Sequence, residues 1–166
     1  MEQTILVAYA TRYGSTREVA EAIGTALREE GAAVDVVRAD EVADITPYAM
    51  AVIGSPVYAG KCLPDALAFV TRHREALERI PVAVFAVGIL IAEDTPGNRQ
   101  KVRAALDPVL QLVTPVSTAL FAGKLDPKAL PFPLRIMLKV MKTPEGDYRN
   151  WDAIRSWAKR LGAGSG

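Results

Sequence analysis

The sequence predicts an α/β fold in which five parallel strands form one sheet with helices on both faces. Apolar, β-branched runs recur at residues 5–9, 34–37, 50–53, 82–87 and 116–121. Between these runs lie segments with the 3.6-residue periodicity of amphipathic helices. Strands that alternate with helices need crossover connections, and such connections make neighbouring strands parallel and cover both faces of the sheet.

The length and charge fit one folded domain. The chain has 166 residues, of which 50% are hydrophobic, and 20 Lys and Arg against 19 Asp and Glu give a net charge of +1. A chain of this length buries roughly two thirds of its unfolded surface. The charge balance indicates neither disorder nor nucleic-acid binding. We expect one domain over residues 1–161 and a flexible tail at 162–166, where Gly, Ala and Ser cannot bury side chains.

Four segments carry the signals that begin and end helices. Residues 15–30 place apolar side chains on one face and end at Gly31. Residues 64–73 follow the same periodicity. Residues 95–112 begin with Thr95 as N-cap and Pro96 at the first helical position. Residues 151–161 predict the last helix.

The cysteine and histidine content limits the chemistry of the chain. Cys62 is the single cysteine and His73 the single histidine, which excludes disulfide frameworks, Cys/His zinc clusters and dithiol redox pairs. Any redox chemistry must therefore come from a bound cofactor, and we expect no metal site. His73 lies in a charged stretch, so we expect it to be solvated and without a catalytic role.

The apolar runs also bear on location. All of them are shorter than the roughly 18 residues that a membrane-spanning helix needs. The first residues lack the basic and long apolar regions of a secretory signal. The sequence favours a cytoplasmic location.

The loop after the first strand is suited to a phosphate group. It combines hydroxyl side chains, a glycine and the backbone amides of a helix N-terminus, which together form an anion cradle. The candidate ligands are Thr11, Arg12, Tyr13, Gly14, Ser15 and Thr16. The loop has neither the Lys of a P-loop nor the three glycines of a dinucleotide fingerprint, so it favours a lone phosphomonoester over NTP or NAD. The alternative is a turn that only caps the helix.

In its composition and its place after the first strand, this motif resembles the phosphate-binding loop of flavodoxins. The resemblance implies a flavodoxin-like three-layer sandwich with strand order 2-1-3-4-5 and one FMN, bound without covalent attachment. In flavodoxins, hydroxyls and amides hold the FMN phosphate. A response-regulator receiver shares this strand order but needs an Asp after the third strand, where this chain has Gly54 and Ser55.

The resemblance also assigns two loops to the flavin ring. The first follows the third strand and supplies Ser55, Pro56, Val57, Tyr58, Ala59 and Gly60. Tyr58 is expected to stack on the ring, with packing against the second helix as the alternative, and Gly60 leaves its peptide free to reorient. The second loop supplies Val87, Gly88, Ile89 and Asn98. It lacks the usual Tyr, so either it leaves that face of the ring open to a second aromatic molecule or its aliphatic side chains close the pocket.

Two features separate the chain from carrier flavodoxins. That group is strongly acidic, whereas this chain has a net charge of +1. Residues 134–142 also predict a basic amphipathic helix that short flavodoxins lack. Arg135, Lys139 and Lys142 share one face, and Leu134, Met137, Leu138 and Met141 line the opposite one. Such a helix either packs on the sheet edge or forms a membrane or partner surface near the flavin.

The same segment, with Asp147-Tyr148-Arg149-Asn150-Trp151, resembles the menaquinone-dependent protoporphyrinogen oxidase branch of the flavodoxin family. The resemblance implies an oxidoreductase of heme biosynthesis with a porphyrinogen donor and a quinone acceptor, placed peripherally at the inner face of the membrane. The loop before Thr95 is short and not basic, and Tyr58-Ala59 replaces that branch's arginine-tyrosine pair. A flavodoxin that carries electrons between redox proteins is the alternative.

Overall fold

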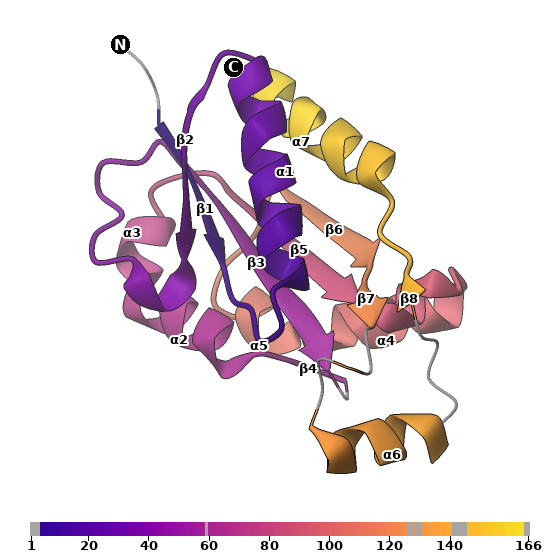
Figure 1. The fold of residues 1–166 in the computed structure, drawn as a ribbon. Helices are drawn as coiled ribbons and strands as arrows, with labels where there is room; N and C mark the ends of the chain where they lie inside the picture. The colour runs from indigo at the N-terminus through magenta and orange to yellow at the C-terminus, as the bar shows by residue number, and fades with distance from the viewer. Residues whose placement is uncertain (1–3, 59, 126–127, 129–130, 141–145, 165–166) are drawn as a thin grey trace.

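The computed structural model describes residues 4–58, 60–125, 128, 131–140 and 146–164 (Figure 1). Its parallel sheet has the order β2-β1-β3-β5-β6. These strands are β1 (Thr4–Tyr9), β2 (Ala33–Arg38), β3 (Met50–Tyr58), β5 (Val82–Gly88) and β6 (Ser117–Ala122). The two-residue β4 (Lys61–Cys62) pairs antiparallel with the end of β3. The predicted fold and order 2-1-3-4-5 are confirmed, because β4 is a hairpin arm outside the parallel series.

Helices cover both faces of the sheet. On one face, α1 (Ser15–Glu29) and α7 (Trp151–Gly164) lie side by side (Figure 1). The other face carries α2 (Pro64–Arg72), α3 (Arg74–Leu77), α4 (Pro96–Ala105) and α5 (Asp107–Leu110). Alternate residues of β1 pack into the two layers. Val7 and Tyr9 lie in the layer under α1 and α7, while Leu6 and Ala8 lie in the layer under α2, α3, α4 and α5. The continuous apolar strand runs follow from burial on both faces.

An aromatic cluster fills the layer under α1 and α7. The Phe85 ring lies 6.1 Å from Trp157 and 6.2 Å from Phe121, centroid to centroid. The indole of Trp157 also donates to the Ser117 hydroxyl at 2.9 Å, which satisfies its polar atom. A Cβ added at Gly54 would lie 2.0 Å from the Phe85 ring. Glycine at position 54 is thus required by the ring that crosses it.

The first prediction concerns that close approach. Gly54→Ala is expected to lower the free energy of unfolding by about 1–3 kcal/mol, because the added methyl forces Phe85 out of its place. Urea denaturation measures the change. Gly97→Ala is the matched control, since nothing lies within 4 Å of a Cβ there. Equal stability of the two variants would contradict the prediction.

The third strand is longer than the sequence predicts. Residues 54–58, expected as a loop, continue β3, and Ser55 and Pro56 pair with Ala86 and Val87 of β5. Pro56 is tolerated because its nitrogen points to the β1 side, as the amide of Gly54 does, and the last hydrogen bond on that side joins the Ala10 amide to the Gly54 carbonyl. Among the described residues β1 offers no partner beyond Gly54, so the missing amide of proline breaks no hydrogen bond, while the other side of the strand still pairs with β5.

Two helix boundaries also differ from expectation. The predicted helix over 95–112 divides into α4 and α5 at Leu106, because Pro108 has no amide to continue the hydrogen-bond ladder. The last helix continues past its predicted end at residue 161 to Gly164. Gly162 faces α1, where an added Cβ would lie 3.3 Å from the Glu30 side chain.

The expectation of a solvated His73 is wrong. Its side chain is 9% exposed, and its ring packs on Phe69 with 4.9 Å between centroids. The charged neighbours in sequence are solvated, but the chain turns at the end of α2 and directs the imidazole back onto that helix. Nε2 has no hydrogen-bond partner, and burial lowers the pKa of His73 below its usual 6.5.

A pH dependence of stability follows from this burial. Unfolded His73 binds a proton near pH 6.5 and the folded form resists it, so its contribution is fully present above that pH and is lost as pH falls through the lowered folded pKa. The stability difference between wild type and His73→Gln is expected to shrink from pH 7.5 to pH 5. Urea denaturation at both values checks this, and a constant difference would contradict it.

Candidate flavin site

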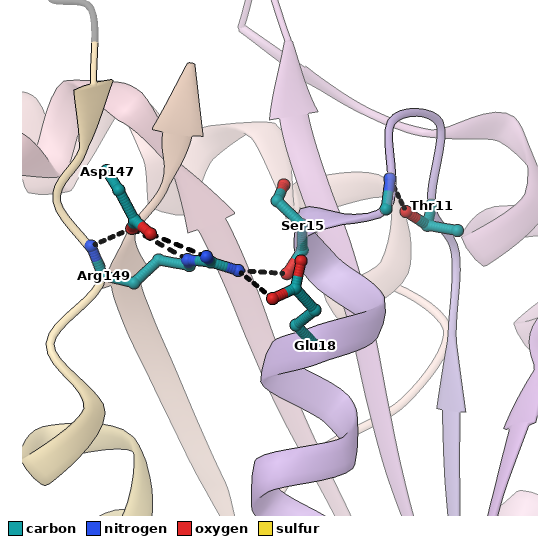
Figure 2. A network of polar contacts seen from close by, with 6 residues as sticks. Thr11, Ser15, Glu18, Asp147 and Arg149 are labelled. Atoms are coloured by element: carbon teal, nitrogen blue, oxygen red, sulfur yellow. Dashed lines mark hydrogen bonds and ion pairs between the residues drawn. The ribbon is translucent and has the colours of Figure 1, made fainter. Parts of the chain in front are cut away.

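The loop between β1 and α1 is preorganised by two local features. The Thr11 hydroxyl accepts a hydrogen bond from the Gly14 amide at 3.0 Å (Figure 2). Gly14 is the N-cap of α1 and has a φ of 88°, a left-handed conformation that disfavours other residues. No side chain caps the helix, so the amides of Ser15, Thr16 and Arg17 have no acceptor within it. These open amides are an anion site at the positive end of the helix dipole.

Two buried hydroxyls in the same loop have no protein partner. Thr16 is fully buried, and its Oγ1 makes no hydrogen bond. The hydroxyl of Tyr13 is likewise buried without a partner. An unsatisfied buried polar atom costs about 1–3 kcal/mol, so it indicates a ligand group that completes its hydrogen bonds. The residues therefore fit a terminal phosphate, and Thr16 is the side chain best placed to hold it.

The aromatic residues of the first two loops lie together. Tyr13 and Tyr58 meet edge to face with 5.7 Å between ring centroids. Burial raises the pKa of Tyr58 to about 12, so its hydroxyl stays neutral at physiological pH. The guanidinium of exposed Arg12 lies 5.6 Å from the centroid of the Tyr13 ring. The loop's one cation is therefore held on an aromatic face at the surface.

A β-hairpin forms the second loop. Val57 and Tyr58 pair with Cys62 and Lys61, and Gly60 is a turn residue between the two arms. Gly60 has a φ of 76°, and Ala59 lies outside the described residues. The buried hydroxyl of Ser55 donates to the carbonyl of Pro56 and accepts from the amide of Leu63. The Ser55 oxygen, which accepts from Leu63, the N-cap of α2, therefore fixes the start of that helix, and the hydroxyl hydrogen is used on the neighbouring carbonyl.

The third loop starts directly after β5. Val87 and Gly88 are the last residues of that strand, and the 3₁₀ turn η2 (Ile89–Ala92) begins at Ile89. The side-chain amide of Asn98 donates to the carbonyls of Leu90 and Glu93, at 3.1 and 2.9 Å. In this structure Asn98 holds the turn in shape. Ile89 and Leu90, directly after the end of β5, are half-buried aliphatic residues.

Strand register brings the three loops to one edge of the sheet. Tyr9 is opposite Gly54, and Pro56 is opposite Val87, so β1, β3 and β5 end side by side. Ligands bind to doubly wound sheets at this edge, next to the point where strand order reverses. The reversal lies between β1 and β3. The predicted site residues of the phosphate loop and the hairpin are thus brought together there.

Sequence reasoning missed Arg149 as a residue of the site. Its side chain is only 4% exposed and reaches the first turn of α1, where it donates to the carbonyl of Ser15 and pairs with Glu18, both at 3.4 Å (Figure 2). Ser15 and Arg149 are 134 residues apart, so no local pattern signals the contact. The available sequence signal is that Arg149 lies two residues from Asp147 and two residues from Trp151. Asp147 forms an ion pair with it, and the Trp151 ring packs on its guanidinium.

Comparison with known proteins agrees with this geometry. A family model described as "Flavodoxin domain" matches residues 6–152. The protoporphyrinogen IX dehydrogenase [quinone] of Escherichia coli K12 is 25% identical over 94% of this chain and 93% of that protein. A Streptococcus pneumoniae TIGR4 flavodoxin superposes with a TM-score of 0.60 at 16% identity, covering 97% of this chain and 99% of that one. A Lactobacillus acidophilus flavoprotein solved with FMN gives 0.53 at 15% identity, covering 72% and 93%.

The chain belongs to the flavodoxin family. FMN, the cofactor expected from this family, has one terminal phosphate, and the Thr11–Thr16 loop fits such a phosphomonoester.

Proposed function

We propose that the protein is an FMN-dependent oxidoreductase that dehydrogenates a porphyrinogen and reduces a quinone. The similarity to the Escherichia coli dehydrogenase, which extends over nearly the whole of both chains, supports this reaction class. The observation that carries the proposal is a helix, α6 (Phe132–Val140), that the flavodoxin sheet does not need. It lies in an excursion between β7 (Lys124–Leu125) and β8 (Gly146–Asp147), which pair antiparallel.

Helix α6 stands apart from the sheet, at the end where β4, β7 and β8 lie (Figure 1). Its exposed large apolar side chains are Phe132 at 64%, Ile136 at 49%, Met137 at 45% and Val140 at 77%. Monomeric soluble proteins rarely expose apolar groups in such a cluster unless a partner covers them. This apolar cluster differs from the predicted one: Phe132, Ile136 and Val140 belong to it, and Leu134 is half-buried. Met141 and Lys142 lie outside the described residues.

Two cations border the apolar cluster. Arg135 and Lys139 are exposed, and at 100° per residue they lie next to Phe132 on the helix. An exposed apolar strip with a cationic border is typical of helices that lie in the interface of an anionic membrane. Among the described residues, no helix combines the length and apolarity needed to cross a bilayer. We therefore propose that α6 makes peripheral contact with the membrane surface. There the protein meets a lipid-soluble quinone that stays in the membrane.

The rim of the flavin site supports a planar organic substrate. Ile89 and Leu90 offer half-buried aliphatic surface in place of the tyrosine that flavodoxins place over the ring. Bound FMN would supply the hydrogen acceptor and the electron donor for the two half-reactions. The residues of this chain hold the phosphate, shape one side of the site and keep Tyr58 neutral.

Anaerobic turnover tests the proposal. Purified protein is mixed with protoporphyrinogen IX and a soluble menaquinone analogue, and porphyrin fluorescence is followed. Porphyrin formation that depends on both protein and quinone is expected. If the porphyrinogen does not reduce the bound FMN, the proposal is overturned.

The second candidate is an electron carrier, and the similarity of the whole fold to carrier-sized flavodoxins favours it. A carrier is expected to turn over neither small molecule, while its reduced form passes electrons rapidly to a small redox protein such as cytochrome c. The same preparation therefore separates the two functions.

A further inference from the structure

We propose that Arg149 is a positioning residue for the FMN phosphate, because it fixes the first turn of α1 to the base of the α6 excursion. The amides open to the phosphate belong to that turn. The proposal rests on FMN as the cofactor and holds for either candidate function.

The contacts of Arg149 come from three separate parts of the chain. Asp147 in β8 receives the guanidinium in a two-pronged ion pair, with 2.9 Å from Nε to Oδ1 and 2.7 Å from Nη2 to Oδ2. The Trp151 ring at the start of α7 lies 4.7 Å below the guanidinium carbon. Nη1 then reaches the Ser15 carbonyl and the Glu18 carboxylate on α1 (Figure 2). The arginine is thus oriented by β8 and α7 and acts on α1.

The fork geometry explains why this residue orients the turn. A planar guanidinium fixed by a carboxylate on one edge and a ring on one face has its remaining N–H groups aimed in set directions. Those groups hold the carbonyl of Ser15, the first residue of α1, and a carboxylate one turn later. The amides of Ser15, Thr16 and Arg17 belong to the same turn, so its orientation decides whether they converge on one anion.

The segment also joins the cofactor loop to the excursion. The Tyr148 amide donates to the Gly123 carbonyl at 3.1 Å, and Asp147 pairs with Lys124, so Arg149 follows directly on the β7–β8 ladder. Arg149 is therefore the link between the base of the excursion and the phosphate loop. Asp147 is held charged, since the neighbouring guanidinium lowers the pKa of its carboxyl.

Paired titrations of FMN and riboflavin test the role. Riboflavin lacks the phosphate, so a residue that positions the phosphate turn affects only FMN. With apoprotein of the full chain, Arg149→Met is expected to raise the Kd of FMN about tenfold or more and that of riboflavin less than twofold. Arg155→Met is the control, because Arg155 makes an exposed pair with Asp152 on α7. Equal weakening of both ligands, or an unchanged Kd for FMN, would overturn the proposal.

A second variant, Asp147→Asn, separates an effect of positioning from an effect of net charge on FMN binding. It also tests the proposal if Arg149→Met fails to fold. Removing this negative charge makes the site more positive, so an effect of charge alone tightens FMN binding. Loss of the anchor for Arg149 instead weakens it, and about threefold weakening with unchanged riboflavin binding is expected. Tighter or unchanged FMN binding would overturn the proposal.

Hydrogen exchange provides a readout that does not depend on affinity. In wild type, saturating FMN is expected to slow exchange of the Tyr148 amide, because the ligand and Arg149 hold the same turn. In Arg149→Met at saturating FMN this slowing is expected to disappear. Equal slowing in both proteins would contradict the link.

Discussion

Replacing Thr16 with valine is expected to weaken FMN binding by roughly 10- to 100-fold while making the apoprotein more stable. The hydroxyl is fully buried without a partner, so its hydrogen bonds are completed only by the ligand. A hydrogen bond to a charged group contributes about 1.5–3 kcal/mol, which gives the expected loss. Valine keeps the branched shape and removes an unsatisfied polar atom, so the apoprotein is expected to gain about 1 kcal/mol.

Fluorescence titration with FMN and urea denaturation of the apoprotein measure the two opposite changes. Thr71→Val is the matched control, because the Thr71 hydroxyl donates to the Leu67 carbonyl on the exposed side of α2. That variant is expected to leave FMN affinity unchanged. A Thr16→Val protein with wild-type affinity would place the phosphate away from this hydroxyl.

Charge reversal at three cations, Arg135 and Lys139 of α6 and Lys142 after it in the sequence, is the other change with a large expected effect. Arg135→Glu/Lys139→Glu/Lys142→Glu is expected to reduce binding to anionic liposomes about 100-fold or more, because each cation near an anionic surface contributes about 1 kcal/mol. FMN content is expected to stay at the wild-type level, since none of these residues belongs to the phosphate loop. Turnover with a membrane-bound quinone is expected to fall along with binding.

The control carries the same change of charge elsewhere. Arg155→Glu/Lys159→Glu/Arg160→Glu alters three exposed cations of α7, which packs beside α1 on the sheet. Sedimentation with phosphatidylserine vesicles compares the two variants. If both bind alike, net charge alone governs attachment, and the exposed apolar side chains of α6 have another role.

The fold could be predicted from the sequence because its signals are local and repeated. Apolar runs such as residues 82–87 are buried on both faces of the sheet. A fully buried strand is a continuous apolar run, which is recognised in the sequence without knowing which elements pack on it. The N-cap at Thr95 accepts from the Asn98 amide as predicted. The tight turn at Gly14 and the start of α1 could be predicted as well, since the glycine, the hydroxyls and the helix start are consecutive in the chain, and the phosphate that they fit stays a prediction.

Local pattern failed where the direction of a side chain or pairing with another strand sets the environment. Charged neighbours made His73 look solvated, yet packing against Phe69 buries it. Residues 54–58 looked like a loop because they contain glycine and proline, but pairing with β5 extends the strand. The contacts of Asn98 with two carbonyls of its own loop were not expected, and its place at the flavin stays a prediction.

Local sequence was sufficient to predict the strand and helix series, the sheet edge that holds the candidate site, and a loop whose residues fit one phosphate. These depend on periodicity and on residues within one or two turns of each other. Two features depend on tertiary contacts: Arg149 reaches α1 across 134 positions, and α6 leaves apolar side chains uncovered. An ion pair and an exposed face are set by what lies nearby in space, and the sequence pattern of a helix is the same whether or not another element covers it.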